Sequence, residues 1–188
     1  MWDIKKSNLK KGVWKMFENL KPMYQEEELQ KRIKEIAEEI DKDYMGKEIV
    51  IVCVLKGAIF FTVDLVKKMK TPIELETVQI SSYCGTESKG KLSMKKDLDS
   101  SVEGRDVLIV EDIVDTGKTL KWLRDYLINE KKAKTVKIAV LMDKKERRAI
   151  EVPIDYIGFS IPNKFVVGYG FDVDEKGRNI PYVGYLDE

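Results

Sequence analysis

The chain has 188 residues, 34 basic and 33 acidic side chains, two cysteines and no histidine. The balanced charge predicts no overall attraction to nucleic acid or to a membrane, and no apolar run reaches the roughly 20 residues that span a bilayer. The missing histidine excludes Ser-His-Asp and Cys-His catalysis and, with only two cysteines, argues against a zinc site.

Acid–base chemistry therefore falls to carboxylates, lysine or tyrosine. A bound metal ion would be a hard cation held by oxygen, which favours magnesium. Two separate cysteines, and an N-terminus without an apolar core, indicate a cytoplasmic protein.

Helix and strand patterns alternate along the chain. Residues 1–21 are basic with scattered aromatic side chains and are expected to form a packing arm. Leu29, Ile33 and Ile36 then recur at helical spacing, which predicts an amphipathic helix that ends near Gly46. The remaining patterns predict strands at 48–55, 73–82, 107–110, 135–142 and 155–159, an apolar helix at 58–69, a long mobile loop at 81–98, a helix with Leu120, Leu123 and Leu127 on one face, and extended tail segments at 164–167 and 182–186. This order implies one α/β domain with a mainly parallel sheet and helices on both faces.

The most informative segment begins with the buried strand at 107–110. Glu111 and Asp112 come directly after this strand, and the small-residue turn and helix start at 115–119 come after them. Ligands of open α/β sheets lie at the carboxyl ends of strands, and a helix start favours a phosphate. The carboxylates would repel that phosphate, so they need sugar hydroxyls or a metal as partners. A ribose 5-phosphate satisfies both demands, whereas the alternative is an acidic turn and a capped helix without a ligand.

The segment EDIVDTGKT resembles the ribose-phosphate motif of the phosphoribosyltransferases, in the form of the hypoxanthine-guanine branch, and the resemblance extends from about Tyr24 to Leu186. It implies the type I phosphoribosyltransferase fold, a twisted, mainly parallel sheet flanked by helices. Within a single domain over 1–188, the core would cover about 24–160. A small hood would be built from the tail, about 161–188, with the N-terminal arm.

The resemblance also implies roles for the residues of this segment. Glu111 and Asp112 would accept hydrogen bonds from the ribose hydroxyls near a Mg²⁺ ion, and Asp115 would be the general base that faces the purine N7. Lys144 would contact the 6-oxo group of the base. The 5-phosphate would be wrapped by the loop of Asp115, Thr116, Gly117, Lys118 and Thr119.

Other matches lie along the rest of the chain. Lys56 and Gly57 match the pyrophosphate loop, in which the peptide before the lysine is often cis in relatives, and Ser82 and Tyr83 match the catalytic lid. One departure is Lys145, where proline is common. In the tail, Phe165 would stack on the base, the Val166 backbone would bond its edge, Lys164 and Arg178 would lie near pyrophosphate, and Asp172 would lie near the base edge or a second metal.

The activity implied by the resemblance is transfer of 5-phosphoribose from phosphoribosyl diphosphate to a 6-oxopurine, hypoxanthine or guanine, in cytoplasmic purine salvage. Magnesium would be the cofactor, the partners small-molecule substrates without nucleic acid or membrane, and the assembly a homodimer or homotetramer. Two alternatives stay open: a transferase that prefers xanthine, and a regulator of the same fold that senses a nucleotide. A regulator should show a basic, aromatic-laced face, so the balanced charge and the presence of Tyr83, Asp115 and Lys144 favour the enzyme.

Overall fold

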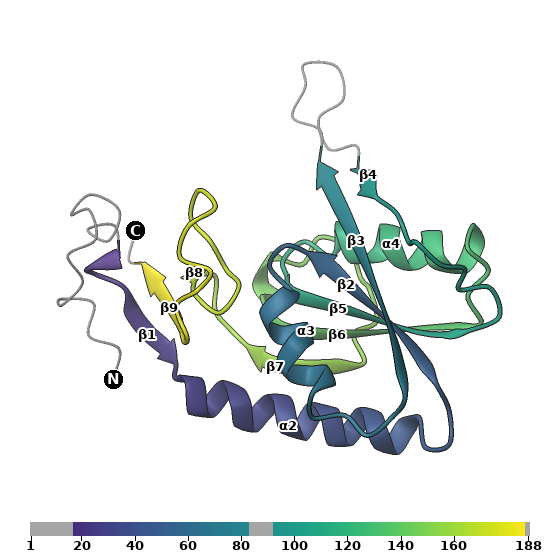
Figure 1. The fold of residues 1–188 in the computed structure, drawn as a ribbon. Helices are drawn as coiled ribbons and strands as arrows, with labels where there is room; N and C mark the ends of the chain where they lie inside the picture. The colour runs from purple at the N-terminus through teal and green to yellow at the C-terminus, as the bar shows by residue number, and fades with distance from the viewer. Residues whose placement is uncertain (1–16, 83–91, 187–188) are drawn as a thin grey trace, which may run out of the picture.

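The computed structural model describes residues 17–82 and 92–186. They form two sheets and the helices that cover them (Figure 1). The helices are α2 (Glu26–Asp43), α3 (Ile59–Val66), α4 (Lys118–Asn129) and the 3-10 helix η3 (Lys145–Arg147). The strands are β1 (Lys21–Tyr24), β2 (Ile49–Leu55), β3 (Ile73–Ser82), β4 (Leu92–Lys96), β5 (Asp106–Val114), β6 (Thr135–Asp143), β7 (Tyr156–Ser160), β8 (Phe165–Val167) and β9 (Val183–Leu186).

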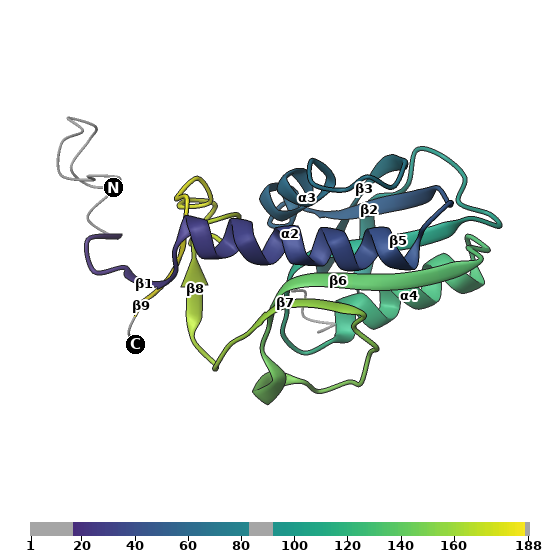
Figure 2. The same cartoon turned by 90° about the horizontal axis from the view of Figure 1, so that it is seen from below.

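The larger sheet has the order β4-β3-β2-β5-β6-β7, and its pairs are parallel except for β3 with β4. Successive side chains of a strand point to opposite faces, so the apolar runs feed two separate cores. Ile49 and Ile51 of β2 pack with α2 and α3, whereas Val50 and Val52 pack with α4. The two layers of helices are visible in Figure 2. The predicted α/β class, with a mainly parallel sheet flanked by helices, is confirmed.

Helix α2 forms because its apolar residues recur on one face and its first turn is capped. Leu29, Ile33 and Ile36 are fully buried. Gln25 and Glu28 form a capping box, and the acidic first turn favours the helix dipole. None of the helices in the described residues is long and apolar enough to cross a membrane.

Strand β5 is longer than its apolar run predicts. Its parallel register with β6 continues through the pair Val114 and Asp143, so Glu111 and Asp112 lie inside the strand and not in a turn after it. The predicted end at residue 110 is wrong because backbone pairing with β6 extends the strand beyond its run of apolar side chains. The acidic pair is therefore held rigidly.

The predicted mobile loop at 81–98 is also wrong for part of its length. Leu92–Lys96 is the edge strand β4, antiparallel to β3, with Ser82 paired to Leu92. Lys96 Nζ donates to the Thr77 carbonyl at 3.0 Å, which ties this edge to the sheet. Residues 83–91, with the predicted lid residue Tyr83, lie outside the described residues.

The smaller sheet has the order β1-β9-β8, all antiparallel, and forms the hood together with the tail segment 168–178. Phe17 and Leu20 pack against Val167 and Ile180 of the tail. The start and the end of the described chain are thus joined beside the larger sheet (Figure 1).

Candidate active site

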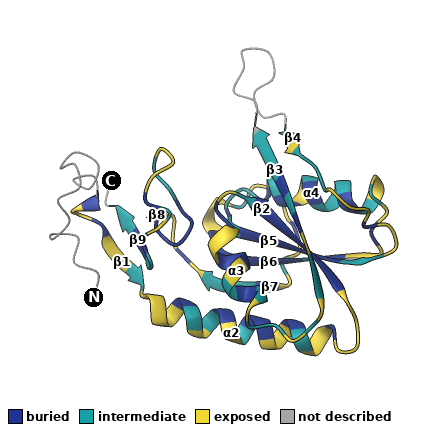
Figure 3. Ribbon diagram, viewed as in Figure 1, coloured by how far each residue is buried: buried dark blue, intermediate teal, exposed yellow. Residues whose placement is uncertain are grey.

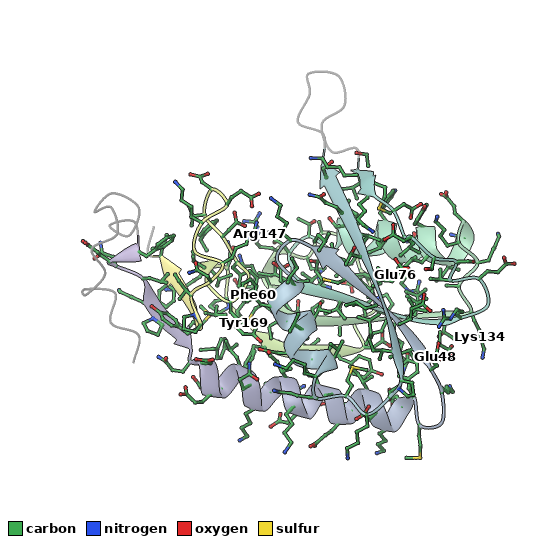
Figure 4. All side chains as sticks on the ribbon, viewed as in Figure 1. Glu48, Phe60, Glu76, Lys134, Arg147 and Tyr169 are labelled. Carbon is green, nitrogen blue, oxygen red and sulfur yellow. The ribbon has the colours of Figure 1, made fainter. Side chains whose placement is uncertain are left out.

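The predicted site residues that follow or end β2, β5 and β6 lie at the carboxyl ends of these strands, on the side of the hood (Figure 4). Figure 4 shows Arg147 at this end of the sheet, with Phe60 and Tyr169 nearby, while Glu48 and Lys134 lie at the opposite end. Parallel strands bring the loops at their ends together, and the Lys144 amide donates to the Val114 carbonyl at 3.0 Å. The loops after β5 and β6 are therefore in direct contact.

Glu111 and Asp112 form a pair of adjacent carboxyl groups, of which Glu111 is buried and Asp112 partly buried. Glu111 is only 9% exposed. Burial raises the pKa of Glu111 well above its usual range and the neighbouring charge of Asp112 adds to the effect; burial also raises the pKa of Asp112, which the charge of Arg178 opposes. The Asp112 side chain accepts the Ile113 amide at 2.8 Å, which fixes its orientation.

These two groups fit a hard divalent cation by their chemistry, since two adjacent carboxylates, one buried and one partly buried, need positive charge and supply oxygen donors. No cluster of three or more acidic, histidine or cysteine side chains is arranged for a metal within 17–82 and 92–186. The predicted third ligand Asp172 instead lies 2.8 Å from the Arg178 guanidinium. A cation here would need further oxygens from water or substrate.

Gly57 lies directly against this pair. A Cβ atom at position 57 would come 1.7 Å from Asp112 Oδ2, so the close approach requires glycine. The peptide bond between Leu55 and Lys56 is cis. The predicted pyrophosphate loop and the predicted ribose contacts are therefore neighbours.

The loop between β5 and α4 surrounds a hollow of about 200 Å³. Gly117 has a φ of +82°, and a Cβ atom there would meet the Ile150 carbonyl oxygen at 2.5 Å. The Thr116 carbonyl accepts the amides of residues 149 and 150, which anchors the loop from outside. The hollow is lined by Glu111, Asp112, Ile113, Val114, Asp115, Thr116, Gly117, Thr119 and Leu120. The start of α4 thus faces the same space as the carboxyl pair, while Lys118, its first residue, is exposed.

Lys144 and Asp115 are neighbours, and the structure adds Arg147 to them. Lys144 is 9% exposed, and its pKa is lowered chiefly by burial and also by Arg147, against the opposing charge of Asp115. Arg147 Nε lies 2.8 Å from Asp115 Oδ1, an ion pair without hydrogen-bond alignment, so this buried oxygen receives no hydrogen bond within the described residues.

Sequence reasoning missed Arg147 because the basic run at 144–148 does not show which cation lies beside Asp115. The turn η3 carries Arg147 back toward Asp115, while the next residue, Arg148, pairs with Asp143. Lys145, at the departure from relatives, begins this turn.

The tail folds over the predicted pyrophosphate loop. A Cβ atom at Gly170 would come 2.2 Å from the Gly57 carbonyl oxygen. Lys56 Nζ lies 3.1 Å from Glu175 Oε2, and the Arg178 guanidinium lies 3.1 Å from the same oxygen. Glu175 thus brings Lys56 and Arg178 together. The sequence motifs did not indicate a role for Glu175.

The remaining predicted residues lie at the edge of the hood. The Phe165 side chain is 51% exposed, whereas Val166 is buried in β8. Lys164 Nζ lies 3.8 Å from the centre of the Tyr185 ring. Ser82 ends β3 at the limit of the described segment. Phe165 therefore offers a free aromatic surface, as a stacking role requires.

Comparison with known proteins identifies the family of this chain. The family model of the phosphoribosyl transferase domain matches residues 21–174. A curated hypoxanthine-guanine phosphoribosyltransferase of Streptococcus thermophilus is 47% identical over 169 residues, 89% of this chain and 93% of the relative.

Two solved structures have the same fold. A hypoxanthine-guanine phosphoribosyltransferase from Bacillus anthracis has a TM-score of 0.84 at 41% identity and covers 88% of this chain and 98% of its own. A hypoxanthine phosphoribosyltransferase from Staphylococcus aureus has a TM-score of 0.85 at 42% identity, over 92% and 94% of the two chains. The chain therefore belongs to the phosphoribosyltransferase family, in its hypoxanthine-guanine branch.

Proposed function

We propose that this protein transfers 5-phosphoribose from phosphoribosyl diphosphate to hypoxanthine or guanine, giving the nucleoside monophosphate and pyrophosphate, in cytoplasmic purine salvage. The observation that carries the proposal is the shared hollow at the end of β5. Two adjacent carboxyl groups, Glu111 buried and Asp112 partly buried, line it together with the start of α4, where a helix favours phosphate, and this pairing matches a ribose 5-phosphate.

The sugar phosphate is held by groups of opposite character. Backbone N–H groups at Gly117 and the start of α4 receive the 5-phosphate, with hydroxyls from Thr116 and Thr119. Glu111 and Asp112 accept the ribose hydroxyls. Mg²⁺ held by this pair, with further oxygens from water or substrate, would neutralise charge on the diphosphate. Lys56, Lys164 and Arg178 supply the fixed positive charge around that leaving group.

The base lies between the tail and the loop after β6. Lys144 donates to the 6-oxo oxygen, Phe165 stacks on the ring, and the Val166 backbone bonds the pyrimidine edge. As purine N9 bonds to the anomeric carbon and pyrophosphate leaves, the N7 proton passes to Asp115. Ser82 and Tyr83 would close over the centre and exclude water.

The experiment that tests this function is pyrophosphate release with hypoxanthine, guanine, xanthine and adenine, each with and without Mg²⁺. The Lys144 ammonium can only donate hydrogen bonds, so it pairs with a 6-oxo oxygen but not with the amino group of adenine. Adenine should therefore react more slowly, by up to about 10⁴-fold. Adenine turnover within tenfold of hypoxanthine contradicts the role of Lys144. A clear preference for xanthine supports the alternative transferase, and nucleotide binding without any release supports the regulator. Full activity in chelator contradicts the magnesium role.

We further propose a homodimer or homotetramer, supported by apolar exposure on α3. Ile59, Phe60 and Val63 are 40%, 37% and 46% exposed on this helix, and Figure 3 shows exposed residues along its outer side. Light scattering should give two or four times the 21.8 kDa of one chain. Val63→Glu should lower that mass, because a charge would be buried at the contact. A monomeric wild type contradicts this assembly.

A further inference from the structure

One carboxylate oxygen joins two cations that come from distant parts of the chain. Glu175 Oε2 accepts hydrogen bonds from Lys56 Nζ and from the Arg178 guanidinium, each at 3.1 Å. Lys56 belongs to the loop after β2, and Arg178 to the tail. An anionic oxygen shared by a lysine and an arginine is the contact that a phosphate group makes.

The position of Glu175 is fixed by its backbone, while its side chain is free to leave. The Glu175 amide donates to Asp172 Oδ2 at 2.9 Å, and its φ is +63°. Its side chain is 63% exposed. Exposed ion pairs contribute little to stability, so a stronger anion displaces the carboxylate without disturbing the fold.

We propose that Glu175 is an internal competitor of the diphosphate, an inference that rests on the proposed function. In the free protein its carboxylate occupies the anion position between Lys56 and Arg178. Diphosphate carries more charge and more oxygens, so the bound substrate displaces it. After transfer, the return of Glu175 to the two cations favours release of pyrophosphate.

The test measures binding of inorganic pyrophosphate with Mg²⁺ by calorimetry in wild type, Glu175→Gln and Asp174→Asn. The amide keeps the size of Glu175 but loses the charge that competes for the cations. Its dissociation constant for pyrophosphate should fall about two- to fivefold, the range expected for an exposed pair. Asp174 is the matched control, because it is the neighbouring acid in the same turn and contacts neither cation in the described residues. Its variant should stay within about twofold of wild type.

A second measurement separates release from binding. In stopped-flow assays with a coupled pyrophosphate reporter, Glu175→Gln should release pyrophosphate more slowly by the same factor as its affinity rises. Unchanged or weaker affinity overturns the competitor role, and weaker affinity means that Glu175 holds the cations in place for the ligand. These outcomes leave the proposed function standing when wild type transfers phosphoribose. Wild type without any transfer contradicts the function itself.

Discussion

Burial and the charge of Asp115 act on the pKa of Lys144 in opposite directions. Lys144 must stay an ammonium to donate to an oxo group, yet burial lowers its pKa, and Arg147 lowers it further. Asp115 raises the pKa and so keeps the proton in place. In the proposed mechanism, the charge of Asp115 would therefore serve the base contact as well as the proton transfer.

Arg147→Gln should extend base recognition to higher pH. A positive neighbour disfavours the ammonium, so its removal raises the pKa of Lys144 and moves the loss of binding upward. The shift should be small, since Arg147 is half-exposed and screened by solvent. The measurement is the pH dependence of inosine monophosphate binding to wild type and to the variant. Ionisation of the nucleotide affects both profiles equally, so it does not contribute to the difference between them.

The control for this change is Lys145→Gln, which removes a cation from the same turn η3 without a contact to Asp115 among the described residues. A shift of equal size in the control assigns the effect to general charge. A downward shift in Arg147→Gln contradicts the placement of Arg147 beside Lys144.

Single residues were predictable where one short segment carries the chemistry. The acidic pair and the turn at 115–119 are adjacent in sequence, and all of them except Lys118 line one hollow. Arg147 and Glu175 were not predictable, because their roles come from contacts across the fold. Glu175 meets a lysine 119 residues away, and no local pattern encodes that meeting.

At the scale of elements, the spacing of apolar residues predicted the helices and strands that bury an apolar face. The range of β3 agrees with the predicted 73–82, and α2 agrees in its apolar face. The predictions were wrong where backbone pairing between strands, and not side-chain pattern, determines the structure. Strand β5 continues past its apolar run because β6 pairs with it, and β4 exists because β3 offers it an edge. Helix α3 ends at Val66, three residues before its predicted end, as the chain turns toward Pro72.

At the scale of the molecule, the hood is attached to the larger sheet through a polar cluster on two helices. The Tyr169 hydroxyl donates to Asp64 of α3 at 2.6 Å. Gln30 of α2 also donates to Asp64, and Lys68 donates to Gln30 at 2.7 Å. Burial and this hydrogen bond raise the pKa of Tyr169, so its hydroxyl remains a donor over the working pH range. The attachment lies beside Gly170, which contacts the Gly57 loop.

Tyr169→Phe should loosen the hood without removing any group proposed to bind substrate. A hydrogen bond to a charged acceptor is worth about 1.5–3 kcal/mol, so the free energy of unfolding should fall by about that amount. Amide hydrogen exchange should rise in residues 165–178, and KM for phosphoribosyl diphosphate should increase, because Lys56 and Arg178 meet only when the tail is seated. Tyr182→Phe is the control, since Tyr182 packs in the apolar cluster of the hood itself. Equal amide hydrogen exchange in residues 165–178 of both variants contradicts the attachment role of Tyr169. Loss of a hydroxyl inside the hood would then have the same effect as loss of the hydrogen bond to α3.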